Sequence, residues 1–171
     1  MLGYAKSAVL LLCTVALCVN ASPTSIDEQY PVTTRGGCDP QNGTSKRYYV
    51  YNNRGVTFFE AWRLCQSVGL RLATITSQDD SRLIAEAVQA SSNSKGPWWV
   101  GGVDLGNKGI FVWISTNQLV GYGNGYFDFD VGQPDNSAGI EDCLEIARGE
   151  GVRWNDIRCD LRQRYICENV L

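Results

Sequence analysis

Five side chains between positions 133 and 156 carry oxygen atoms that suit a hard metal ion. They are Gln133, Asp135, Glu141, Asn155 and Asp156. The set contains no histidine or thiolate, and calcium prefers about six to eight oxygen ligands at roughly 2.3–2.6 Å. Three of the five are acids, which repel one another when they gather in one loop. Their spacing alone leaves two interpretations open: the acids surround a calcium ion, or they fan out into solvent.

Two helices are predicted upstream of this loop. Thr57 and Glu60 have the spacing of a capping box, in which both side chains satisfy free amides at a helix start. The first helix then ends near Gly69. The segment 77–80, Ser-Gln-Asp-Asp, is typical of the start of a second helix. The apolar residues with helical spacing are Phe58, Ala61, Trp62 and Cys65 in the first helix and Leu83, Ile84, Ala87 and Val88 in the second.

Short β-prone runs supply the rest of the framework. They lie at 46–52, 98–103, 110–114, 142–147 and 164–168. A turn is expected at 52–55. The stretch 115–141 shows little periodicity, and a loop of this length inside a compact domain is usually functional or disordered. All five tryptophans, Trp154 included, are expected in the core.

The first 21 residues have the features of a secretory signal peptide. Lys6 supplies the positive charge, residues 8–19 form an apolar run, and Val19-Asn20-Ala21 suits signal peptidase. A membrane anchor is the alternative, but the run is shorter than the roughly 18–20 apolar residues that span a bilayer. We expect a flexible leader at 22–37 and one secreted, extracellular domain at 38–171. The net charge of −3 argues against nucleic acid as a partner.

The cysteines fit an oxidising compartment. Cys13 and Cys18 leave with the signal peptide. The mature chain keeps Cys38, Cys65, Cys143, Cys159 and Cys167. Two disulfides are expected, and the fifth cysteine is free or pairs with another chain. The absence of histidine and of a Cys-x-x-Cys pair argues against zinc. A sequon at Asn42 predicts a glycosylated surface loop.

Several landmarks follow one another in a characteristic order. They are Cys65 at the end of the first helix, a second helix, Trp99-Val100-Gly101, Gln133-Pro134-Asp135, Glu141-Asp142-Cys143, Trp154-Asn155-Asp156, and the late cysteines Cys159 and Cys167. With these landmarks the chain resembles the C-type lectin-like domain family from about Cys38 onward. The resemblance implies an α+β fold, with two helices flanking small antiparallel sheets and a long calcium-binding loop. It also implies the disulfides Cys65–Cys167 and Cys143–Cys159.

The resemblance assigns a role to each oxygen donor. Gln133 and Asp135 are the paired loop ligands for calcium, presented on one side by a cis peptide at the proline between them. Glu141 is the next ligand, and Asn155 and Asp156 complete the site. In such lectins two neighbouring sugar hydroxyls coordinate the ion and also hydrogen-bond its ligands. The side chains expected to bind carbohydrate are Gln133, Asp135, Glu141 and Asn155, and their Gln-Pro-Asp motif favours galactose over mannose.

The chain departs from the family pattern in two places. A second calcium site, present in many members, would use Asp104, Asn136, Glu141, Asp142 and the position of Lys108. Lys108 places a cation where an acid is expected, which argues against a second ion. Galactose-binding members usually carry a tryptophan just after Gln-Pro-Asp, but residues 137–140 are Ser-Ala-Gly-Ile. The alternative stacking surfaces for sugar are Tyr126, Phe127 and Phe129.

These features favour a secreted, calcium-dependent lectin that recognises microbial or cell-surface glycans, as in innate immunity. An enzyme is disfavoured, because the chain lacks histidine and nothing fixes the separation of Asp128, Asp130 and Asp135 for glycoside hydrolysis. The alternative is a C-type lectin-like module that binds a protein, with calcium structural or absent. Cys38 is the only cysteine of the mature chain upstream of Cys65, so we expect it to form a disulfide-linked dimer.

Overall fold

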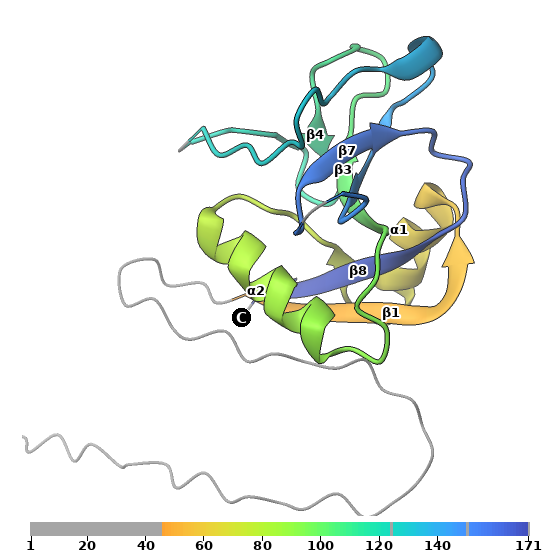
Figure 1. Cartoon of the computed structure of the whole chain (residues 1–171), viewed down its shortest axis with the longest axis vertical. Helices are drawn as coiled ribbons and strands as arrows, with labels where there is room; N and C mark the ends of the chain where they lie inside the picture. Colours follow the sequence, from red (N-terminus) through yellow and green to blue (C-terminus); the bar gives the residue numbers. More distant parts are fainter. Residues whose placement is uncertain (1–45, 124, 150, 171) are drawn as a thin grey trace, which may run out of the picture.

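Two strands from opposite ends of the domain pair along most of their length. β1 (Lys46–Val56) and β8 (Gln163–Val170) run antiparallel, with Lys46 opposite Val170 (Figure 1). The computed structural model describes residues 46–123, 125–149 and 151–170. The turn that we predicted at 52–55 is absent from β1. The strand continues to Val56 with a shift in register after Tyr51. The pair therefore brings the two ends of the described chain together.

Four expectations concern residues 1–45, which the structure does not describe. The signal peptide at 1–21, the leader at 22–37, the possible interchain Cys38 and the Asn42 sequon all lie outside the described residues. Within the described part of the chain, neither helix has the length and apolar character needed to cross a membrane.

Both predicted helices are present, but only one has the predicted cap. In α2 (Gln78–Ala90) the Ser77 hydroxyl accepts the amide N–H of Asp80 at 3.1 Å. In α1 (Phe58–Ser67) the Thr57 side chain makes no capping hydrogen bond, so the predicted capping box is wrong. The first amide of α1, that of Phe58, donates to the carbonyl of Cys159 at 3.0 Å. The predicted apolar faces of both helices are buried, except that Trp62 is only partly covered.

Six shorter strands complete the sheet. They are β2 (Arg71–Leu72), β3 (Trp98–Val103), β4 (Val112–Trp113), β5 (Gln118–Leu119), β6 (Cys143–Ile146) and β7 (Trp154–Ile157). β3 has the predicted bounds, β4 is the centre of the predicted strand at 110–114, and β7 was not predicted. All pairs are antiparallel except β3 with β8, so one mixed sheet replaces the separate small sheets that we expected. The α+β fold class is confirmed.

Both expected disulfides are present. Cys65–Cys167 ties α1 to β8. Cys143–Cys159 joins the first residue of β6 to the segment after β7. The second bridge therefore closes the β6–β7 hairpin at the end where its strands meet the long loop.

Trp154 at the start of β7 anchors the long loop to the core. Its indole is fully buried, like those of Trp98, Trp99 and Trp113. Phe129 and Tyr126, both from the long loop, pack edge-on against the Trp154 ring at centroid distances of 5.3 and 5.8 Å. Because Asn155 and Asp156 follow Trp154 directly in β7, this packing sets the position of the loop relative to both residues.

Candidate functional site

Three of the predicted ligands converge. One carboxylate oxygen from each of Asp135, Glu141 and Asp156 lies within 4.8 Å of the others. Asp156 comes from β7 and is only 1% exposed, whereas Asp135 and Glu141 come from the loop and are more accessible. The spacing of the acids left open whether they cluster or spread into solvent. In the structure these three acids cluster.

The Asp156 carboxylate orders the loop that carries Asp135. Its Oδ1 accepts the amide N–H of Asp135 at 3.1 Å, and its Oδ2 accepts that of Asn136 at 2.8 Å. The peptide bond between Gln133 and Pro134 is cis, as expected, and the Gln133 Oε1 also accepts the Asp135 amide at 3.1 Å. A strand residue thus holds the Asp135–Asn136 side of the Gln-Pro-Asp turn in place.

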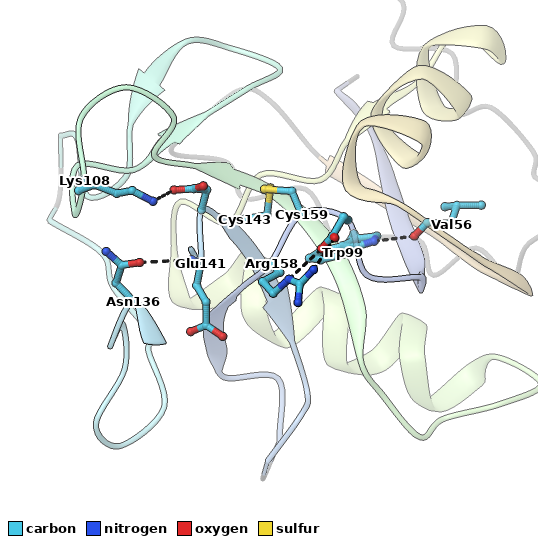
Figure 2. The surroundings of a disulfide bond; sticks show 10 residues. Val56, Trp99, Lys108, Asn136, Glu141, Cys143, Arg158 and Cys159 are labelled. Atoms are coloured by element: carbon cyan, nitrogen blue, oxygen red, sulfur yellow. Dashed lines mark hydrogen bonds and ion pairs between the residues drawn. A yellow bond between two sulfur atoms is a disulfide. The ribbon is translucent and has the colours of Figure 1, made fainter. Parts of the chain in front are cut away.

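Glu141 closes the other side of the loop. Its amide N–H donates to the Asn136 side-chain oxygen at 3.2 Å, an interaction drawn in Figure 2. Its carboxylate Oε2 accepts the amide of Ser137 at 3.0 Å, and the same amide lies 3.1 Å from Asp135 Oδ1. One backbone N–H between the two loop acids, that of Ser137, therefore faces both of their carboxylates.

Burial and the acids of the cluster together raise the pKa of Glu141. Burial is the largest cause, and the negative charges of Asp156 and Asp135 add to it, while the hydrogen bond from Ser137 opposes them. A hard divalent cation would relieve both the repulsion and the lost solvation. Because all donors are carboxylate or amide oxygens, the residues present fit calcium.

Asn155 is fixed by a residue that the sequence did not single out. Its side-chain nitrogen donates to Glu145 Oε1 at 2.8 Å across the β6–β7 pair. Glu145 is fully buried and also ion-pairs with Arg148. The hydrogen bond to Glu145 thus fixes the side-chain nitrogen of Asn155, and its side-chain oxygen is the atom that can bind a cation. One signal in the sequence could have identified Glu145. It is an acid between Leu144 and Ile146 in an apolar strand, and a buried acid requires a partner.

Lys108 stands at the position where family members with a second calcium ion have an acidic ligand. Its ammonium group ion-pairs with the Asp142 carboxylate (Figure 2). Asp104, another position of the second calcium site found in many family members, is buried and accepts the Gly109 amide at 2.7 Å. The positive charge beside Asp142 is therefore supplied by the chain itself.

The three candidate stacking aromatics differ in exposure. Tyr126 and Phe129 are partly buried against Trp154, whereas Phe127 is 57% exposed. Of the three, Phe127 has the most ring surface to offer a ligand.

Comparison with known proteins agrees with this geometry. The family model described as "Lectin C-type domain" matches residues 54–169. The chain belongs to the C-type lectin family. A perlucin-like protein of Mytilus galloprovincialis is 32% identical to this C-type lectin over 146 residues, which cover 81% of this chain and 90% of that protein. A salivary C-type lectin 2 of Aedes albopictus is 31% identical over 138 residues, 77% of this chain and 85% of that protein.

Solved structures place the C-type lectin in the same fold. The carbohydrate-recognition domain of the mouse scavenger receptor C-type lectin superposes with a TM-score of 0.61 at 27% identity, and the match covers 78% of this chain and 98% of that domain. C-type lectins are carbohydrate-binding domains that usually bind calcium and are generally not enzymes. The acidic cluster at Asp135, Glu141 and Asp156 is consistent with that family property.

We predict that Glu141→Gln makes the calcium-free lectin more stable at pH 7. With a raised pKa, Glu141 favours the folded state fully only below its ordinary pKa of about 4.3. That contribution is lost as the pH rises through the raised pKa, and glutamine avoids the loss. Urea unfolding in chelator at pH 4 and pH 7 measures the effect. Glu86→Gln, on the exposed face of α2, is the control, and an identical pH dependence for Glu141→Gln and wild type would contradict the prediction.

Proposed function

We propose that this C-type lectin binds calcium through Gln133, Asp135, Glu141, Asn155 and Asp156 and uses the ion to hold carbohydrate. The convergence of Asp135, Glu141 and Asp156 within 4.8 Å carries the proposal, because ionised acids this close repel one another and a bound cation removes that repulsion. When bound, calcium supplies open coordination positions for two neighbouring sugar hydroxyls. The side chains around it supply the hydrogen bonds that orient the sugar.

The hydrogen-bonding capacity of these side chains favours galactose-type sugars. Gln133 can donate through its amide, whereas ionised Asp135 and Glu141 only accept. The donor and the acceptor of the Gln-Pro-Asp turn are exchanged relative to a Glu-Pro-Asn turn, which is associated with mannose. We infer that a pair of equatorial and axial hydroxyls, as in galactose, matches this polarity.

We place the protein outside the cell, where it would recognise microbial or cell-surface glycans. Three observations support this proposal. Residues 1–21 have the composition of a signal peptide, both described disulfides suit an oxidising compartment, and relatives include salivary lectins of Aedes albopictus.

Calcium should stabilise the domain. Sites in extracellular modules have a Kd of roughly 10⁻⁴–10⁻³ M, so about 10 mM calcium should add about 1–3 kcal/mol to the free energy of unfolding. Asp135→Ala should abolish this gain and the calcium-dependent binding of a glycan array. Asp160→Ala removes an exposed acid that pairs with Arg158 outside the cluster, and it should behave as wild type. Identical unfolding in calcium and in chelator would refute the calcium site, and calcium-dependent stability without any glycan binding would favour a protein partner.

Exchanging the polarity of the turn should move sugar preference. The double variant Gln133→Glu with Asp135→Asn keeps the net charge of the site, so its calcium affinity should change little. The ratio of galactose to mannose affinity should fall by about tenfold or more, equivalent to about 1.4 kcal/mol. Competition of immobilised glycan binding by the two monosaccharides measures this ratio. A wild-type protein that already prefers mannose would disprove the galactose assignment.

Cys38 should join two chains. It lies upstream of β1 in the sequence, near the start of the expected domain, and two linked sites raise avidity on a surface that both can reach. The secreted protein should migrate as a dimer on a non-reducing gel and as a monomer after reduction. Cys38→Ser should be monomeric in both lanes, and a wild-type protein indistinguishable from it would rule out the linkage.

A further inference from the structure

An apolar groove lies beside the proposed calcium site. It has a volume of about 410 Å³, and Pro134 forms part of its wall. Pro134 stands between Gln133 and Asp135, two of the proposed calcium ligands. The groove therefore reaches the turn that carries two of the residues proposed to hold the sugar.

The remaining walls come from a hairpin and from the long loop. Ile110, Leu119 and Val120 belong to the β4–β5 hairpin or its edges, and Phe127 and Phe129 belong to the loop. Val112 pairs with Leu119 across the hairpin, and the Val120 amide donates to the Phe111 carbonyl at 2.9 Å. Backbone hydrogen bonds thus hold this side of the groove in shape.

Large apolar side chains of the groove are exposed and yet held in place. Ile110 is 48% exposed, Leu119 49% and Phe127 57%. The Phe127 ring stacks on Phe129 and lies so close over Gly121 that a side chain at that position would overlap it. Gly121 also has a φ of +80°, which other residues rarely adopt. A fixed, contiguous and exposed apolar surface of this kind marks a binding site more often than isolated exposed residues do.

The chemistry of the walls selects the occupant. The described residues that line the groove have no charged side chain and no hydroxyl or amide group in their side chains. A second hexose placed there would leave its hydroxyls without side-chain partners, which is costly when they lose water. An alkyl chain has no such groups and gains free energy with each methylene that it buries.

We propose that this groove binds the alkyl or acyl chain of a glycolipid whose sugar is held at the calcium site. The inference rests on the proposed function, since the sugar supplies the attachment that places the chain. It adds a ligand class: amphipathic glycosides, in which calcium and the neighbouring side chains bind the polar head and the groove between Pro134 and Leu119 binds the first part of the tail.

Chain-length dependence of glycoside affinity tests the proposal. Methyl and octyl β-galactoside, the latter below the concentration at which it forms micelles, are titrated into the full-length protein in calcium. Burial of even two or three methylenes should make the octyl glycoside bind about tenfold or more tightly. Leu119→Asp should reduce that ratio to about twofold or less, and the milder Leu119→Ala should lie in between. Val68→Asp puts the same charge on a similarly exposed apolar position outside the groove and should keep the wild-type ratio.

Each outcome decides between the two proposals. Equal affinities for methyl and octyl glycoside, or a ratio that survives Leu119→Asp, would overturn the groove and leave the lectin site standing. If neither galactoside binds, the same pair of mannosides is used, because the groove does not depend on which sugar the ion selects. If no methyl glycoside binds in calcium, the proposed lectin function fails, and the inference built on it fails too.

Discussion

The buried carboxylate of Asp156 joins the framework of this domain to its loop. β7 fixes its position in the sheet, and the Trp154 indole, two residues earlier, is packed in the core. A buried carboxylate is costly unless hydrogen bonds or a cation compensate it. Two backbone N–H groups of the Gln-Pro-Asp turn provide part of that compensation and are thereby fixed in space. The same charge that shapes the loop therefore also creates the demand for a cation.

Local patterns in the sequence predicted the elements whose cause is local. The start of α2 and both bounds of β3 were expected within a residue, because the cap of the helix and the apolar run of the strand each lie in consecutive residues. β7 was missed because Asn155 and Asp156 have low β-propensity. Its extended conformation depends on pairing with β6, which the local sequence does not indicate. The predicted Thr57 cap is absent, and the Phe58 amide bonds to the carbonyl of Cys159, a contact between distant segments that local spacing does not reveal.

The candidate site was predictable only in part. The order of the landmarks pointed to Asp135, Glu141 and Asp156, and their carboxylates do meet. Nothing local indicated that Glu145 would fix Asn155, because that contact exists only once β6 and β7 are paired. The apolar groove could not be predicted from the sequence either. Its walls come from a hairpin and a loop segment whose packing is set by contacts with Phe129 and Gly121.

The pairing of Lys46 with Val170 has a mechanical consequence. It places both ends of the described chain at the end of the molecule opposite the calcium loop in Figure 1. Tension between a captured surface and an attachment at the end of β8 would pass through β7, β6, β3 and β8, which are successive neighbours in the sheet. Cys143–Cys159 lies where that load enters and Cys65–Cys167 where it leaves. The two covalent bridges thus reinforce the strands at which peeling would begin.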